Sequence, residues 1–131
     1  MKRVSLSLIL IGSLLLASAC NPGAVGDKVR IGVFMSTTGT TANFGISSGN
    51  GIPLAPPGIN APAGINGTQV ELLIQDDRSD ANEAATIVTK FVTQDQVHAI
   101  LGEVASSRSI AAAPIAQNAQ IPMLTPSSTN P

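Results

Sequence analysis

Hydroxyl side chains are concentrated in two short stretches of the sequence, "ASSRS" at residues 105–109 and "TPSSTN" at residues 125–130. Such clusters can act as a nucleophile, as a cradle for phosphate or as one wall of a binding site. A nucleophilic serine needs a general base within hydrogen-bonding reach. The only histidine, His98, stands at the start of a predicted strand and the serines follow its end, so roughly 15–20 Å separates them. We therefore predict no catalytic residue and a protein that is not an enzyme.

The sequence also lacks the features that recognise nucleotides, nucleic acids or metal ions. The segment "GEVASS" has neither the glycines nor the lysine of a phosphate-binding loop. The chain has a net charge of −1 and three aromatic residues, so no basic, aromatic-rich surface indicates nucleic acid as a partner. Asp76, Asp77 and Asp80 could be a metal cluster, but two strand-end carboxylates and a helix cap explain them more simply. We expect no metal and no cofactor.

The elements that position these serines are predicted from four apolar stretches. Strands are expected at residues 29–35, 69–77, 97–102 and 121–126. These stretches are continuously apolar rather than alternating, which is typical of a sheet covered on both faces.

Two helices are predicted between these strands, one before and one after the third strand. An apolar face at i, i+3, i+4, i+7 and i+8 consists of Ala84, Ile87, Val88, Phe91 and Val92. Asp80 and Glu83 form a capping-box pattern in front of that face. Residues 106–119 form the second helix, with Pro114 near its first turns or kinking it. Strands alternating with helices of this length predict an α/β fold with a parallel sheet and right-handed crossover helices.

The first crossover is the exception, because residues 44–67 contain four prolines, at positions 53, 56, 57 and 62. An interior proline removes a helical hydrogen bond and costs on the order of 3 kcal/mol. We therefore expect either an irregular crossover or a damaged sequence in this region.

The first 19 residues have the pattern of a lipoprotein-type signal peptide. Lys2 and Arg3 precede an apolar run that ends in small residues. The run "LLLASAC" resembles a bacterial lipobox, which predicts cleavage before Cys20, lipidation of its thiol and a tether over residues 20–28. The alternative is ordinary cleavage that leaves Cys20 as a free thiol. The lipid would be the only membrane contact of an exported protein in the periplasm or at the cell surface.

Four stretches in order, "IGVFMSTTGTTANFG", "GINGTQVELLIQDDRSD", "ILGEVASSRS" and "IPMLTPSSTNP", resemble the start of the periplasmic branched-chain amino-acid-binding proteins. These are the solute receptors of ABC importers, with two α/β lobes that close on a ligand. The resemblance implies that residues 29–131 form a partial first lobe, with the second lobe absent. Members often have a disulfide near Ser79 and Ala105, and neither position is a cysteine here.

The resemblance also implies a role for the serines. In the family, the ligand's α-carboxylate is bound at the ends of the third and fourth strands. The Ser106 hydroxyl would donate to this carboxylate, Ser127 would contribute backbone groups, and Thr129 its hydroxyl and backbone N–H. Phe44 would line the pocket for the ligand's side chain. The alternatives are that the serines at 106–109 cap a helix and that Phe44 is a core residue.

The expected function is therefore an extracytoplasmic receptor that captures a small, branched-chain type amino acid for an ABC permease. One alternative is a sensory or regulatory module of the same fold that binds amides or urea-like solutes. Another is a truncated gene product without function. Neighbouring genes for a permease and an ATPase would favour the receptor of an ABC importer over both alternatives.

Overall fold

A computed structural model describes residues 28–61 and 64–130, and the predicted signal peptide and Cys20 lie outside this part of the chain. The described residues form four strands, β1 (Val29–Met35), β2 (Val70–Asp76), β3 (Ala99–Leu101) and β4 (Met123–Leu124). They also form four α-helices, α2 (Ala42–Gly51), α3 (Ala55–Asn60), α4 (Ala81–Lys90) and α5 (Ser106–Asn118).

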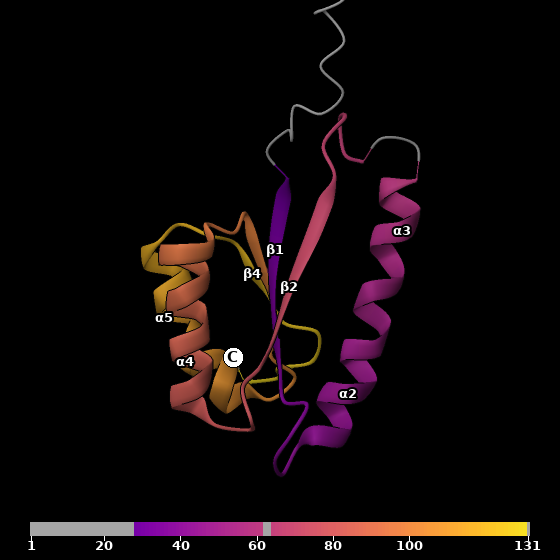
Figure 1. Ribbon diagram of the computed structural model, residues 1–131. Coiled ribbons are helices and arrows are strands. Elements are labelled where there is room, and N and C mark those ends of the chain that lie inside the picture. The colour runs from indigo at the N-terminus through magenta and orange to yellow at the C-terminus, as the bar shows by residue number, and fades with distance from the viewer. Residues whose placement is uncertain (1–27, 62–63, 131) are drawn as a thin grey trace, which may run out of the picture.

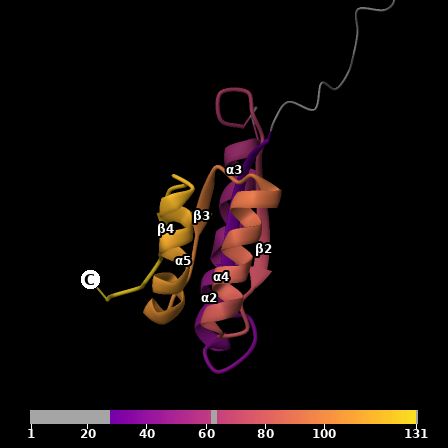
Figure 2. The ribbon, with the colours of Figure 1, turned by 90° about the vertical axis from the view of Figure 1, so that its left-hand side faces the viewer.

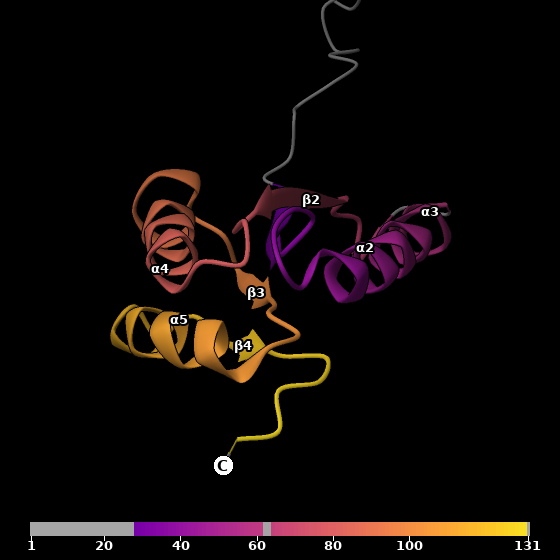
Figure 3. The ribbon, with the colours of Figure 1, turned by 90° about the horizontal axis from the view of Figure 1, so that it is seen from below.

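The strands make one parallel sheet in the order β2-β1-β3-β4. In the register, Val33 lies beside Ile74 of β2 and Leu101 of β3. Helices α4 and α5 cover one face of the sheet, and α2 and α3 lie against the other (Figures 1 and 3). The predicted α/β fold with crossover helices and a parallel sheet is therefore confirmed.

The sheet is buried at its centre and open at its edges. Val33, Phe34 and Met35 of β1 are fully buried, and Phe34 belongs to a core formed with α4 and α5. Strand β4 lies at one edge of the molecule and β2 at the other (Figure 2). Leu124 on β4 is 68% exposed and Ile74 on β2 is 44% exposed. The expectation of a sheet covered on both faces thus holds for β1 and fails at the two edges.

Helix α4 begins as predicted, with Asp80 as its N-cap. The Asp80 carboxylate accepts hydrogen bonds from the backbone N–H groups of Asn82 and Glu83, both at 2.8 Å. The second half of the predicted capping box is wrong, because the Asp80 N–H donates to the Asp77 carbonyl and the Glu83 carboxylate lies 3.6 Å from Arg78. Ala84, Ile87 and Val88 of the predicted apolar face are buried on α4 as expected. Phe91 and Val92 of that face lie in the π-helical turn Phe91–Asp95 that follows α4, where Phe91 is buried and Val92 is partly buried.

The first crossover is helical despite its prolines. Helix α2, a 3₁₀ turn at Ile52–Leu54 and α3 follow one another without an intervening loop. Prolines occupy the beginning of the 3₁₀ turn and of α3, where a missing N–H costs least because it has no intrahelical partner. The crossover is therefore an irregular one, built from short helical segments, which was one of the two expectations for this region. Pro62 lies outside the described residues.

Helix α5 matches the prediction over nearly its whole length, with Pro114 inside it rather than near its first turns. Within residues 28–61 and 64–130, no helix is both long enough and apolar enough to span a bilayer.

Candidate functional site

The loops that follow the four strands meet at the lower end of the molecule in Figure 1. They comprise residues 36–41, 77–80, 102–105 and 125–130. In open parallel sheets, ligands bind in the crevice outside the carboxyl ends of the strands. All residues that the sequence singled out as a ligand site lie in these loops or in the first turn of the helix that follows.

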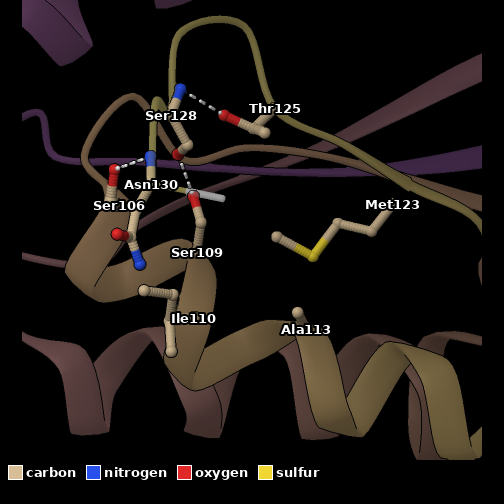
Figure 4. A pocket seen from close by; sticks show the side chains of 8 residues that line it. All are labelled: Ser106, Ser109, Ile110, Ala113, Met123, Thr125, Ser128 and Asn130. Atoms are coloured by element: carbon tan, nitrogen blue, oxygen red, sulfur yellow. Dashed lines mark hydrogen bonds between the residues drawn. The ribbon is translucent and has the colours of Figure 1, made fainter.

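Ser106 and Thr129 are brought into contact. The Ser106 Oγ accepts hydrogen bonds from the backbone N–H groups of Thr129 and Asn130, both at 3.2 Å. Figure 4 shows the bond from Asn130. The hydroxyl proton of Ser106 is not used by these two bonds and can still be donated. The N–H of Thr129, which the resemblance assigns to a ligand, is engaged by Ser106 in this geometry.

Phe44 and Ser127 are brought together at a second point. They line one cavity of about 260 Å³ with Thr41, Val104 and Ala105. The Ser127 Oγ donates to the Val104 carbonyl at 3.0 Å, which joins the loop after β4 to the loop after β3. Phe44 is 69% exposed, so the interpretation of this residue as part of the core is wrong.

A larger cavity of about 290 Å³ lies between α5 and β4 (Figure 4). Ser106 and Ser128 are at its polar end, and its wall includes Ile110, Ala113 and Met123. Both cavities reach the loops at the carboxyl ends of the strands, where ligands bind in open parallel sheets. Ser106 lines the larger cavity, and its neighbour Ala105 lines the smaller one beside Phe44.

The serines at 106–109 do not cap α5. The N-cap residue is Ala105, and no side chain accepts from the first-turn N–H groups. Ser109 is buried, its Oγ accepts from the Glu103 N–H at 3.2 Å, and it donates to the Glu103 carbonyl at 3.0 Å. The capping interpretation is therefore wrong, and Ser109 holds the preceding loop in place.

Glu103 connects the loops after β3 and β4 through its main chain. Its carbonyl oxygen accepts from the hydroxyls of Ser109 at 3.0 Å, Thr125 at 2.6 Å and Ser128 at 3.0 Å. Because Ser128 precedes Thr129, these bonds fix the segment that contains the predicted ligand residues.

The Glu103 side chain is fully buried and is also fully engaged. Its carboxylate accepts from the N–H of Ser36 at 2.9 Å, the N–H of Ala105 at 2.6 Å and the Nε of Arg108 at 3.2 Å. The ends of β1 and β3 and the first turn of α5 are thus connected by one carboxylate.

A second buried carboxylate, Asp77, lies beside the first. The Ser36 Oγ is 2.6 Å from Asp77 Oδ1 and 3.0 Å from Glu103 Oε1. Asp77 Oδ2 has no hydrogen-bond partner. Burial raises the pKa of Asp77, and the nearby negative charge of Glu103 raises it further.

Arg108 is 5% exposed and supplies the positive charge of this buried cluster. Besides Glu103, it donates through Nη2 to Thr41 Oγ1 at 2.6 Å and through Nη1 to the Ser79 carbonyl at 3.4 Å. Its Nε lies 3.9 Å from Asp77 Oδ1. We refer to Ser36, Asp77, Glu103 and Arg108 as the buried polar cluster.

Asp76 and Asp80 have structural roles of their own. Burial alone would raise the pKa of Asp76, but hydrogen bonds from Thr38 and Arg78 and from the N–H of Thr37 outweigh it and lower the pKa to about 2. Asp76 thus holds the loop after β1, and Asp80 caps α4. Among the described residues, no group of three or more His, Cys, Asp and Glu side chains is arranged to hold a metal ion.

His98 lies at the opposite end of the sheet from the serines. It is exposed, its Nδ1 accepts from the backbone N–H of Arg30 at 3.1 Å, and Arg30 is near the start of β1. The predicted separation of this histidine from Ser106 is confirmed.

Four residues at this end of the sheet were not predicted from the sequence as part of the site: Ser36, Thr41, Glu103 and Arg108. One signal was available, because Glu103 is a charged residue directly after the apolar run "AILG". A charge at the end of a central strand is either solvated or paired, and its partners cannot be read from the sequence.

Comparison with known proteins identifies the family of this fold. A model of the periplasmic binding proteins matches residues 28–131. The chain belongs to the periplasmic binding protein family. An "Amino acid binding protein" of Pseudomonas aeruginosa is 38% identical over 82% of this chain and 29% of its own length. A second P. aeruginosa relative, the leucine-, isoleucine-, valine-, threonine- and alanine-binding protein, is 31% identical over 93% of this chain and 32% of its own.

Solved structures of the family have the same fold. The substrate-binding protein LivJ of a branched-chain amino acid transporter from Streptococcus pneumoniae, in complex with isoleucine, superposes with a TM-score of 0.77 at 36% identity. It is matched over 79% of this chain and 30% of its own length. The leucine-binding protein LivK from Thermotoga maritima superposes with a TM-score of 0.71 at 40% identity. The chain thus spans about 30% of the length of these binding proteins.

Proposed function

We propose that this protein is an extracytoplasmic receptor that captures a branched-chain type amino acid at the carboxyl end of its sheet and delivers it to an ABC permease. Its relatives are named as leucine-, isoleucine- and valine-binding proteins, and one neighbour was solved with isoleucine. The proposal rests above all on one observation, the contact of Ser106 with the backbone of Thr129 at the beginning of α5.

The carboxylate end of the ligand would bind at this contact. The first-turn N–H groups of α5 have no side-chain cap, and the positive end of the helix dipole favours an anion. The Ser106 hydroxyl retains a proton to donate, and Ser127 lines the adjacent cavity. A carboxylate there would receive charge-assisted hydrogen bonds from neutral donors.

The side chain of the ligand would lie toward Phe44. The cavity wall here combines the Phe44 ring with Val104 and Ala105. Such a wall suits a branched aliphatic group, which gains free energy by leaving water. Phe44 is among the most exposed large apolar residues of the described chain, so binding would also cover an apolar surface that is otherwise costly.

The protein would act by binding rather than by catalysis. The only histidine is at the far end of the sheet from Ser106, and the nearest acids, Glu103 and Asp77, are buried in hydrogen bonds with the main chain and Arg108. The serine that both carboxylates contact is Ser36, which is itself fully buried.

Export and anchoring complete the proposal. Residues 1–19 would be the signal peptide, residues 20–28 the tether with a lipid on Cys20, and residues 29–131 part of the first of two lobes. The relatives' family name, periplasmic binding protein, supports export. Labelling with radioactive palmitate should mark the wild-type protein and not the Cys20→Ala variant. Equal labelling of both would contradict the anchor.

The receptor proposal is tested by isothermal titration calorimetry on the full-length protein. Leucine, isoleucine and valine should bind with a stoichiometry of one, whereas acetamide and urea should not bind at the same concentrations. Binding of the amides without the amino acids would favour the sensory module that the fold also permits. Binding of neither class would contradict a receptor for either.

A further inference from the structure

Thr41 is the N-cap residue of α2 but does not cap it. A threonine at this position ordinarily accepts a hydrogen bond from a first-turn N–H of its own helix. Here no such bond exists. The Thr41 Oγ1 instead accepts from Arg108 Nη2 at 2.6 Å and lies 3.0 Å from the Ser79 Oγ. The hydroxyl is therefore held by a buried cation, 67 positions away in sequence.

Arg108 can fix this hydroxyl because its own position is fixed. Its side chain is 7% exposed and is held by Glu103 on one side and by the Ser79 carbonyl on the other. A planar guanidinium donates in several fixed directions at once, so three loops are joined at defined angles. A lysine would provide the charge without this geometry.

Thr41 in turn positions Phe44. The Thr41 carbonyl accepts from the N–H groups of Phe44 at 3.1 Å and Gly45 at 3.4 Å. Phe44 itself is 69% exposed and has little packing of its own. Thr41 and Phe44 line the same cavity, so the position of the aromatic ring over that cavity depends on the residue that Arg108 holds.

We propose that Arg108 is a positioning residue that, through Thr41, sets the side-chain end of the ligand cavity and so contributes to selection among amino acids by side-chain size. This inference rests on the proposed function. It assigns a task to a buried side chain that does not touch the cavity, as Arg108 is not among its lining residues.

Two kinds of defect in ligand affinity can be distinguished. A defect in the carboxylate end of the site affects every amino acid equally, because all share that group. A defect in the Arg108–Thr41 contact affects ligands in proportion to the side chain that meets Phe44. Leucine and alanine are therefore the two probes that distinguish them.

The test is calorimetry on the full-length protein with Thr41→Val, which keeps the shape of the side chain and removes the hydroxyl. Loss of one charge-assisted hydrogen bond should lower the affinity for leucine by about five- to tenfold, whereas the affinity for alanine should change less than twofold. Thr41→Ser keeps the hydroxyl and should restore the wild-type ratio of the two affinities. Arg108→Lys should shift the ratio in the same direction as Thr41→Val.

The outcomes are distinguishable. If the wild-type protein binds neither probe, the proposed function fails and this inference fails with it. If the wild type binds and Thr41→Val leaves the ratio of leucine to alanine affinity unchanged, or lowers both equally, Arg108 has only a structural role and the inference is overturned. Thermal melts of each variant confirm that the proteins compared are folded.

Discussion

The hydroxyl oxygen of Ser106 lies 3.2 Å from the backbone nitrogen of Thr129, a residue 23 positions further along the chain. Ser106 begins α5, which follows β3, and Thr129 follows β4. These strands are neighbours in the sheet, so their carboxyl ends bring the two residues together. A contact between the two predicted carboxylate-binding residues therefore follows directly from the parallel topology.

Replacement of Ser106 by alanine should weaken amino-acid binding. The variant loses a donor to the ligand and the acceptor that holds the N–H groups of Thr129 and Asn130. A charge-assisted hydrogen bond contributes about 1–3 kcal/mol, so calorimetry on the full-length protein should show a roughly five- to 150-fold lower affinity.

Ser107→Ala is the matched control for this variant. Ser107 is the neighbouring serine on the same helical turn and is exposed. Its replacement should change the affinity by less than twofold. If Ser106→Ala and Ser107→Ala change the affinity for the amino acid equally, Ser106 does not bind the ligand.

Gly45→Ala should destabilise the fold where α2 approaches β1. An added Cβ would lie 1.9 Å from the Ser36 carbonyl oxygen, a backbone atom that cannot move aside without shifting the strand end. Overpacking of this kind costs about 1–3 kcal/mol. Urea denaturation measures the change.

Gly49→Ala in the same helix is the control, because nothing lies within 4 Å of the added Cβ. Alanine is the better helix former by roughly 1 kcal/mol, so this variant should be as stable as the wild type or more so. A Gly45→Ala variant of wild-type stability would show that α2 does not approach Ser36 this closely.

Asp77→Asn should stabilise the protein at neutral pH. The pKa of Asp77 is raised by burial and by Glu103, so the native state binds this proton more tightly than the unfolded state does. Stability is therefore highest below the ordinary pKa of 3.8 and falls as pH rises through the raised, folded value. Asparagine avoids that loss. Its advantage in urea denaturation should be present at pH 7 and should vanish at pH 3, below the ordinary pKa of 3.8, and a variant less stable than wild type at pH 7 would contradict this sign.

Asp76→Asn should have the opposite effect. The pKa of Asp76 is lowered from 3.8 to about 2, so its contribution to stability is fully present above pH 3.8 and is lost as pH falls through about 2. A shift of this size amounts to about 2.5 kcal/mol in full, and solvent screening at this partly exposed position reduces it to about 1 kcal/mol. Denaturation at pH 7 and pH 2 measures the difference, which should shrink at the lower pH. A loss of equal size at both values would exclude the charge as its cause.

Glu103→Ala should be severely destabilising. It leaves Arg108 buried without its closest carboxylate, and removal of one member of a buried pair costs about 3–5 kcal/mol. Glu71 is the control, because its ion pairs with Lys28 and Arg30 are partly exposed. Glu71→Ala should cost less than about 1 kcal/mol. Similar melting temperatures for the two variants would show that the buried polar cluster does not hold the loops together.

The predicted bounds of the first two strands hold better than those of the last two. β1 was predicted at residues 29–35 and forms at Val29–Met35, and all seven of its residues pair with β2. The last strand was predicted at residues 121–126, yet only Met123 and Leu124 pair. Its flanking residues Pro122 and Pro126 have no N–H to donate, and it has a partner on one side only. Hydrophobicity predicts where a strand can form, and pairing decides its length.

The candidate site was predictable only in part. Ser106, Ser127, Thr129 and Phe44 were located by resemblance to a family. The buried polar cluster was not, because its members come from distant parts of the chain and meet only once the sheet is assembled; Ser36 and Glu103, for example, are 67 positions apart. Arg108 lies between Ser107 and Ser109 in the stretch "ASSRS", and nothing in the neighbouring sequence indicates that it is buried.

The amino acid is expected to bind between the first turn of α5 and the loop after β4. Hydrogen–deuterium exchange of the full-length protein, measured with and without saturating leucine, locates the bound ligand. Leucine should slow exchange at residues 104–107, 127–130 and 41–45 and leave the amides around His98 unchanged. Slowed exchange confined to other parts of the protein, with none at these three segments, would contradict the account.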